Sequence, residues 1–401
     1  MLTHYIKVAW RNMRKHSRRS LTAVFGLAFG IACFVPALYW VRYETSYDSF
    51  YPGAALIYRI YAVDKLSGKV NELAPGILER KMHEHIPGTE TSAVFFAESN
   101  NCSTDALPHI RLQTINTGNN SFFRVFEQEF ISGDAGRPLQ VAGDIVLTES
   151  AAARMFGDAV KAVGQPVQST LYFFNPPYTV TAVVKDPPPN TNLPFDAILF
   201  NDIFQGIASL PEEMQWGQFN AQMYVRLHPG SDAGELAGLL RDFTSRIGAG
   251  DRIGIGMEPL SDVRHSLTPG VFALIFIRLF VAAGALLLFG AMFNCLNLHL
   301  DLFRGRRHGL RIGTTYATNG RFMAQKLSEL AFSILPAMLL AGCLIAIARP
   351  FLSKLLDVGI GMPELLRLFA VCGGGVTVVL ILAVLIQVLK GGNPAGVIKS
   401  E

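Results

Sequence analysis

Residues Leu21–Val41, LTAVFGLAFGIACFVPALYWV, form a stretch of 21 residues without a charged side chain. As an α-helix this stretch would be about 31 Å long, which matches the roughly 30 Å hydrocarbon core of a lipid bilayer. Basic residues stay on the cytoplasmic side of a membrane, and aromatic residues collect at its surfaces. The sequence therefore predicts a membrane-spanning helix that runs from inside to outside, with Tyr39, Trp40 and Tyr43 near its outer end. Six basic residues precede it, which are Lys7, Arg11, Arg14, Lys15, Arg18 and Arg19.

A cleaved signal peptide is the alternative interpretation of an apolar stretch behind N-terminal positive charge. Its apolar region is usually about 7–15 residues long and is followed by small residues at the cleavage site. Here the apolar stretch is longer and bulky aromatic side chains follow it, which favours a retained anchor. Within the helix, Gly26 and Gly30 form a Gly-x-x-x-Gly pair. Because this pattern lets membrane helices approach closely, we expect both glycines at helix contacts.

Three further apolar stretches of membrane-spanning length follow the first one. The chain is 50% hydrophobic and only 16% charged, which differs from the composition of an average soluble enzyme. The sequence predicts a membrane protein with four transmembrane α-helices, one before and three after a large extracytoplasmic α+β domain. The predicted order is a cytoplasmic amphipathic helix (1–20), transmembrane helix 1 (21–41), the extracytoplasmic domain (42–273), transmembrane helix 2 (274–300), a cytoplasmic loop (301–326), transmembrane helix 3 (327–348), a short outer loop (349–367), transmembrane helix 4 (368–389) and a cytoplasmic tail (390–401).

The charges are distributed unevenly along the chain. The segments predicted to be cytoplasmic hold fourteen basic residues against Asp301 and Glu401, whereas residues 42–273 hold 17 basic and 26 acidic residues. The overall charge of +4 therefore hides a basic inside and an acidic outside, as the positive-inside rule expects. Because the basic residues flank membrane spans, they favour contact with membrane lipid and argue against nucleic acid as a partner.

No combination of residues in the sequence points to catalysis. A Gly-x-x-x-x-Gly-Lys-Ser/Thr phosphate-binding loop, a Gly-x-Ser-x-Gly turn and a His-Glu-x-x-His zinc motif are all missing. His83 and His85 are two residues apart and would face different sides of a helix, so they do not predict a metal site. The five cysteines form no disulfide framework and no Cys-x-x-Cys pattern. We expect a protein that is not an enzyme and has no cofactor or metal site of its own.

The segment of residues 42–273 mixes strand-like and helix-like patterns, which predicts an α+β domain. Helices are predicted at Ala74–Ile86, before Pro87 and Gly88, and at Ser150–Phe156, before Gly157. Strands are predicted at Leu56–Val63, Ala93–Ala97, Ile110–Ile115, Ile145–Leu147, Tyr178–Val184, Phe195–Leu199 and Met223–Leu227.

Six short motifs follow one another in this segment. They are Ser46–Phe50 (SYDSF), Ile57–Ile60 (IYRI), Phe122–Phe126 (FFRVF), Ile145–Ser150 (IVLTES), Tyr178–Pro188 (YTVTAVVKDPP) and Asn192–Asp196 (NLPFD). In this order they resemble the extracytoplasmic domain of MacB-like and FtsX-like ABC transporter permeases. The one-plus-three arrangement of spans is also similar to that family's architecture. The sequence is therefore identified as a single permease half with a MacB-like periplasmic core domain.

In this family the loop between the second and third spans carries a coupling helix that docks on the ATPase. The resemblance implies that Asn294 and Asn297 correspond to the Asn-x-x-Asn-Leu sequence that ends the second span, where they can hydrogen-bond across helices. It also implies ATPase contacts by seven residues of the loop, namely Arg304, Arg307, Leu310, Arg311, Tyr316, Ala317 and Arg321.

The resemblance implies the permease subunit of a MacB-like ABC transporter. Such a subunit passes ATP-driven motion from a separate cytoplasmic ABC ATPase to its periplasmic domain, for export or extraction of a substrate. ATP and Mg²⁺ would be bound by the ATPase. The expected partners are that ATPase, a second permease subunit in a homodimer or heterodimer, and a periplasmic or outer-membrane protein. The expected location is the cell inner membrane, with both termini in the cytoplasm.

A membrane-anchored signalling or scaffold protein is the alternative. The family usually has an acidic residue before the Gly-Ile/Leu-Arg sequence of the coupling loop, and no acid directly precedes Gly309–Arg311 here. Tyr316 stands near an expected glycine, and the chain carries one permease half. On this alternative the outer domain binds or regulates a partner without transport.

Overall fold

The structure is a computed structural model that describes residues 11, 14–15, 17–85, 88–169, 177–201, 209–246, 253–266, 270–310, 319–356 and 359–391. The chain divides into two units. We call Met1–Tyr43 together with Phe272–Glu401 the helical unit, and Glu44–Val271 the central domain.

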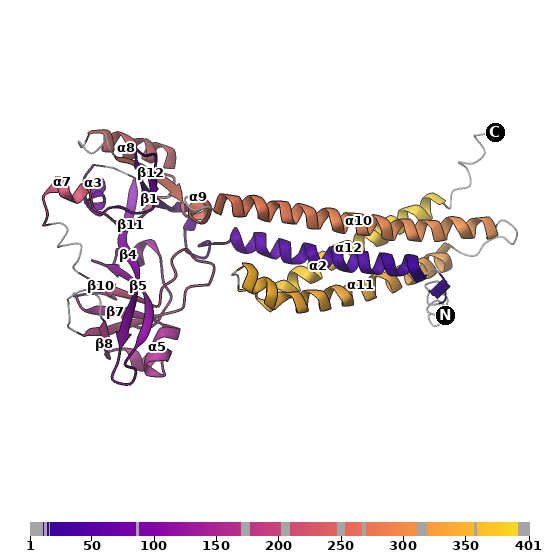
Figure 1. Cartoon of the computed structure of the whole chain (residues 1–401), viewed down its shortest axis with the longest axis horizontal. Helices are drawn as coiled ribbons and strands as arrows, with labels where there is room; N and C mark the ends of the chain where they lie inside the picture. Colours follow the sequence, from indigo (N-terminus) through magenta and orange to yellow (C-terminus); the bar gives the residue numbers. More distant parts are fainter. Residues whose placement is uncertain are drawn as a thin grey trace. The chain divides into compact units, whose positions relative to one another are not determined.

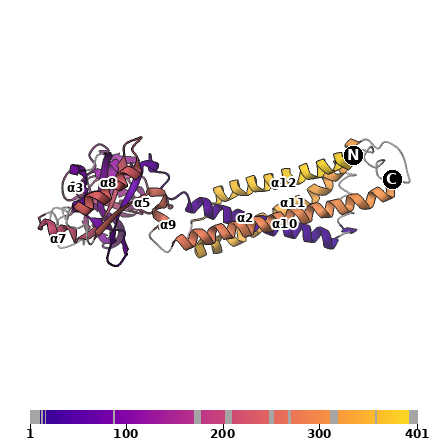
Figure 2. The ribbon, with the colours of Figure 1, turned by 90° about the horizontal axis from the view of Figure 1, so that it is seen from above.

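In the described part of the helical unit there are four long helices. They run side by side in both ribbon views (Figures 1 and 2). Each contains a stretch that is long and apolar enough to cross a membrane, one before the central domain and three after it. The predicted fold class is therefore confirmed. Two helices continue beyond the predicted ends of their spans, into the predicted cytoplasmic loop. The helices are α2 (Ser17–Glu44), α10 (Gly270–Leu310), α11 (Asn319–Leu356) and α12 (Met362–Gly391).

The core of the helical unit draws on all four helices. Leu27 and Ile31 of α2 are fully buried together with Cys295 of α10, Ala337 of α11 and Leu380 of α12. Large apolar side chains elsewhere on these helices remain exposed, as expected of surfaces that face lipid. Prolines within α2 and α11 do not end either helix, because neighbouring helices can compensate for the lost backbone hydrogen bonds in a membrane.

Close contact between α2 and α10 depends on a glycine. A Cβ atom added at Gly30 would lie 2.9 Å from Leu288 Cα, whereas one added at Gly26 would lie 3.8 Å from Ala291 Cβ. The first distance is too short for any side chain, and the obstacle is backbone. The second is an ordinary van der Waals contact. Of the two glycines in the Gly-x-x-x-Gly pair, Gly26 therefore has room for a larger side chain and Gly30 does not.

Replacement of Gly30 by alanine is expected to destabilise the helical unit by about 1–3 kcal/mol, because α2 and α10 must move apart. The matched control is Gly26→Ala, which should leave stability within about 0.5 kcal/mol of wild type or raise it slightly. Thermal unfolding of both variants in the same detergent, followed by circular dichroism at 222 nm, measures the difference. Equal melting temperatures for the two variants would contradict this packing.

A short connection joins α11 to α12. Tyr39 Oη of α2 donates to Gly359 O at 3.1 Å and accepts from Gly361 N at 2.9 Å. Arg349 Nε of α11 donates to Ile360 O at 3.0 Å. These contacts provide hydrogen-bond partners for backbone groups outside the helices. Without partners, such groups would be costly to bury near a membrane.

The central domain is built on one mixed sheet, with strand order β12-β1-β11-β4-β5-β10-β7-β9-β6 (Figure 1). β5 pairs in parallel with β10, and β7 with β9, whereas the other pairs are antiparallel. The described strands are β1 (Ile57–Asp64), β2 (Val70–Asn71), β3 (Ala74–Pro75), β4 (Thr89–Ser103), β5 (Ile110–Thr117), β6 (Phe130–Gly133), β7 (Asp144–Thr148), β8 (Pro166–Ser169), β9 (Tyr178–Val184), β10 (Ala197–Phe200), β11 (Phe219–Leu227) and β12 (Ile253–Pro259).

Short helices cover three parts of this sheet. α3 and α8 bury Leu78 and Leu240 against β1 and β11, α4 buries Phe122 against β4, and α5 buries Met155 against β7 and β9. The helices are α3 (Ile77–His85), α4 (Ser121–Val125), α5 (Glu149–Phe156), α7 (Glu212–Trp216), α8 (Ala233–Arg246) and α9 (Val263–Ser266), with short 3₁₀ turns at Ala54–Leu56, Val160–Ala162 and Leu260–Asp262.

The bounds of α5 follow from local chemistry. Thr148 Oγ1 accepts from Ala151 N at 3.3 Å and caps the first turn. Gly157 ends the helix with φ 78°, a left-handed conformation that glycine adopts without a steric penalty. The predicted helix at Ser150–Phe156 is confirmed within one residue.

The seven predicted strands correspond to β1, β4, β5, β7, β9, β10 and β11. Two of them start too early, since Leu56 ends a 3₁₀ turn and β10 begins only at Ala197. The predicted helix at Ala74–Ile86 is wrong at its start, since Ala74–Pro75 pair with β11 as strand β3. The pairing partner of β3 is far away in the sequence, which is why local propensity missed it. The sequence analysis also did not predict α8 or β12.

Candidate functional site where the chain enters and leaves the central domain

Four of the seven predicted coupling residues lie in helices, and the other three lie outside the described residues. Arg304, Arg307 and Leu310 belong to the last turns of α10, and Arg321 belongs to the first turn of α11. Arg311, Tyr316 and Ala317 lie outside the described residues. The ATPase contact of all seven stays a prediction.

The predicted helix-packing residues have different surroundings. Gly30 is buried against Leu288, and Gly26 is half-buried near Ala291. Asn294 is exposed and Asn297 is half-buried, and no hydrogen bond joins either amide to another described side chain.

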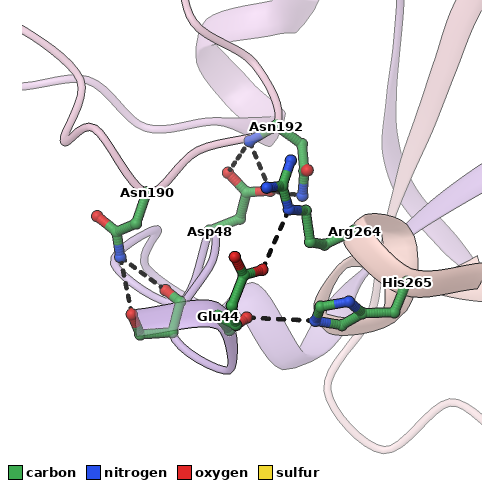
Figure 3. Close-up of polar contacts among 7 residues, drawn as sticks. Glu44, Asp48, Asn190, Asn192, Arg264 and His265 are labelled. Atoms are coloured by element: carbon green, nitrogen blue, oxygen red, sulfur yellow. Dashed lines mark hydrogen bonds and ion pairs between the residues drawn. The ribbon is translucent and has the colours of Figure 1, made fainter. Parts of the chain in front are cut away.

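A second group of residues, not assigned a role from the sequence, gathers where the chain enters and leaves the central domain. The chain enters at Glu44 and leaves at Val271. Segments that are more than 140 residues apart in the sequence meet here through polar side chains (Figure 3). We call this group the junction cluster; it comprises Glu44, Ser46, Tyr47, Asp48, Asn190, Thr191, Asn192, Arg264 and His265.

Asp48 is the centre of the junction cluster. Its carboxylate is completely buried and accepts from Thr191 Oγ1 at 2.6 Å, from Asn192 Nδ2 at 2.7 Å and from Asn192 N at 3.1 Å. Its backbone has φ 56°, a left-handed conformation that Asp tolerates better than most residues. Burial raises the pKa of Asp48 above its usual value, and the hydrogen bonds from Thr191 and Asn192 oppose this rise.

The loop before β10 is tied to the first turn of the domain by backbone contacts as well. Asp48 N donates to Asn190 O at 3.0 Å. Asn190 Nδ2 donates to Ser46 O at 2.9 Å and to Ser46 Oγ at 3.0 Å. Together with the Asp48 contacts, these bonds satisfy polar groups that would otherwise be buried without partners.

The segment that leaves the domain contacts the segment that enters it. Arg264 Nε donates to Glu44 Oε2 at 3.2 Å, and the Arg264 guanidinium carbon lies 4.4 Å from the centre of the Tyr47 ring. His265 Nε2 lies 3.3 Å from Glu44 O, the carbonyl at the C-terminal end of α2. Such terminal carbonyls lack helical partners and attract donors and positive charge. In Figure 3, Arg264 and His265 approach Glu44 from the same short helix.

Beyond the junction cluster, the first and last described strands of the domain pair directly. β1 and β12 are antiparallel, with Arg59 opposite Glu258. Arg59 Nε donates to Glu258 Oε1 at 2.7 Å, and both side chains are less than a tenth exposed. The entering and leaving segments are thus joined twice, by the junction cluster and by this strand pair.

This arrangement joins the segment that enters the central domain to the segment that leaves it. Among the described residues there is no group of three or more His, Cys, Asp or Glu that could hold a metal ion. The polar side chains of the junction cluster are paired with one another. Asp48 and Asn192 belong to two of the motifs that suggested the family, so the sequence carried a signal for them, whereas Arg264 carried none.

Comparisons with known proteins agree with the sequence motifs. The family model of the MacB-like periplasmic core domain matches residues 20–243. A search of curated proteins found no match.

Three solved structures are similar to parts of the chain. One is a domain assigned to a permease protein from Porphyromonas gingivalis, with 20% identity and a TM-score of 0.44, covering 57% of this chain and 99% of that one. Another is the extracellular domain of the ABC-type transporter YknZ from Gram-positive bacteria, with 10% identity and a TM-score of 0.36, covering 50% of this chain and 98% of that one. The third is the periplasmic region of MacB from Actinobacillus actinomycetemcomitans, with 12% identity and a TM-score of 0.38, covering 56% and 94%.

The family match spans more than half of the chain and includes the first membrane-spanning stretch and most of the central domain. The three remaining apolar helices follow the domain, as the sequence analysis predicted for a permease. The protein therefore belongs to the family of MacB-like permeases that carry the MacB-like periplasmic core domain.

Proposed function

We propose that this chain is the membrane subunit of a MacB-like ABC transporter. A separate cytoplasmic ATPase, which binds ATP and Mg²⁺, supplies the energy. The chain transmits the resulting motion to its central domain, which exports or extracts a substrate on the outer side of the membrane. The observation that carries the proposal is that a MacB-like domain stands between the first and second of four apolar helices.

The covalent path of the motion starts at the ATPase-facing end of α10. The predicted coupling residues Arg304, Arg307 and Leu310 belong to its last turns. α10 leads back to Arg264 and His265, and α2 leads to Glu44. Because these three residues contact one another, force on either helix enters the central domain through the junction cluster.

On this proposal the protein resides in the cell inner membrane, and both termini are cytoplasmic. The basic segments then face anionic lipid and the ATPase, and the acidic central domain faces the periplasm. A second permease subunit completes the transporter, as a homodimer or a heterodimer. A periplasmic or outer-membrane protein is a further partner.

The proposal is tested by recovering the tagged full chain from membranes with and without non-hydrolysable ATP. Wild type is expected to bring down an ABC ATPase. Arg311→Glu should reduce its recovery about tenfold or more, because a like charge replaces an attractive contact. Arg278→Glu is the matched control, since Arg278 is exposed near the opposite end of α10. It should leave the recovery unchanged.

Two outcomes would contradict the proposal. One is the absence of any ATPase from material in which the wild-type chain is folded. The other is recovery of periplasmic partners alone, unchanged by Arg311→Glu, which would favour a membrane-anchored signalling or scaffold protein.

A further inference from the structure

Four buried polar side chains in the helical unit belong to α10 and α11. His299 comes from α10, and Lys326, Glu329 and Ser333 come from α11. Lys326 is 2% exposed and Glu329 is 5% exposed. We call these four residues the buried clamp.

The contacts of the buried clamp act within α11 and between the two helices. Lys326 Nζ lies 2.9 Å from Glu329 Oε2, one helical turn apart. His299 Nε2 lies 3.5 Å from Ser333 Oγ, at the long limit of a hydrogen bond. Leu298 and Leu330, which neighbour these groups in sequence, belong to the apolar core of the helical unit. The clamp therefore adjoins a packed core and is not part of a solvated surface.

A buried ion pair is a poor source of stability, because the loss of hydration offsets most of the attraction. Apolar residues of the same size would stabilise such a site equally well or better. Ionisable residues within membrane helices therefore indicate a functional requirement. A paired, hydrogen-bonded group can instead fix the register between two helices. Lys326 and Glu329 pair within α11, whereas the contact between His299 Nε2 and Ser333 Oγ joins the two helices.

The buried clamp lies where α10 and α11 continue into the predicted coupling loop. Beyond His299, α10 continues to Leu310, which adds about 16 Å of helix. Before Lys326, α11 extends back to Asn319, which adds about 10 Å. These two helical extensions, residues 300–310 and 319–325, begin at the clamp. They carry Arg304, Arg307, Leu310 and Arg321 of the predicted ATPase contact.

We propose that the buried clamp is the base that holds the two helical extensions in a fixed position relative to each other. Lys326 and Glu329 are then positioning residues for the ATPase contact, and they act through the extensions without touching the ATPase. The role in ATPase contact rests on the proposed function. The fixed position of the two helical extensions is a property of this chain alone and can be tested without the ATPase.

The first test is amide hydrogen exchange of the full chain in lipid nanodiscs, read by mass spectrometry. Glu329→Gln removes the negative charge that pairs with the buried Lys326 ammonium. It should speed exchange in the two helical extensions about tenfold or more, while α12 keeps its protection. Ser333→Ala, a milder change that removes only the contact of His299, should produce a smaller effect in the same two segments.

Leu330→Ala is the matched control, because it weakens the adjoining apolar core without touching the ion pair. It should speed exchange in α10, α11 and α12 alike. The double variant Lys326→Glu/Glu329→Lys restores a pair of opposite charges and should recover most of the protection that Glu329→Gln loses. The clamp is refuted if Glu329→Gln leaves the extensions unchanged or loosens all helices as Leu330→Ala does.

The second test measures ATPase recovery with the same variants. Glu329→Gln should lower recovery about fivefold or more, whereas Leu330→Ala at a temperature where it is folded should not. Unchanged recovery with Glu329→Gln would overturn the positioning role. If wild type itself recovers no ATPase, the proposed function fails, and the exchange experiment still decides whether the clamp holds the extensions.

Discussion

Replacement of Arg59 by methionine is expected to destabilise the central domain by about 3–5 kcal/mol, because it removes one partner of the buried ion pair between Arg59 and Glu258. The two side chains are 7% and 8% exposed, and Arg59 Nη2 lies 2.6 Å from Glu258 Oε1. Glu72 lies 3.7 Å from Arg59 Nη1, but it is 45% exposed and can return to water. The pair with Glu258 is therefore expected to contribute more to the penalty than the pair with Glu72.

The double variant Arg59→Met/Glu258→Leu separates the cost of an unpaired charge from the value of the pair. Replacement of a buried pair by apolar residues is often neutral, so most of the lost stability should return. Amide hydrogen exchange in β1 and β12 of the full chain measures the free energy of opening for both variants. Equal losses in the single and double variants would show that packing, and not the charge, stabilises this strand pair.

Replacement of Asp48 by alanine is expected to destabilise the central domain by about 4 kcal/mol, from unpaired donors on Thr191 and Asn192 and from strain at a left-handed backbone. The donors are buried or half-buried, and water cannot replace the carboxylate at full strength. The loss should appear first as faster amide exchange at residues 186–194, the loop that the junction cluster holds.

Two further variants divide this loss into its parts. Asp48→Gly removes the same bonds but accepts the left-handed backbone, so it should be less damaging than Asp48→Ala. Asp48→Asn keeps the shape and tolerates this backbone, and it should cost about 1–2 kcal/mol because one acceptor becomes a donor. In thermal unfolding of the full chain, the melting temperature should rise in the order Asp48→Ala, Asp48→Gly, Asp48→Asn. Any other order would contradict this account.

Much of the membrane architecture could be predicted because its cause is local. A bilayer core offers no hydrogen bonds, so each crossing segment must satisfy its own backbone as a helix of sufficient length. Leu21–Val41 met both conditions within a single uncharged stretch. Strands such as β9 were likewise predicted from β-branched residues bounded by turns. By contrast, β3 depends on a partner strand far along the chain, and the continuation of α10 to Leu310 runs through basic residues that hydropathy assigns to a loop.

The sequence alone determined the number of apolar spans, the mixed α+β nature of the domain between them and, through short motifs, the family. Only the tertiary structure decided that Asp48 accepts hydrogen bonds from Thr191 and Asn192, that Arg264 pairs with Glu44, and that Lys326 and Glu329 are buried beside His299. Residues in these contacts lie up to 220 positions apart in the chain. Their pairing depends on where the sheet and the helices bring the backbone, and no local pattern of residues records that placement.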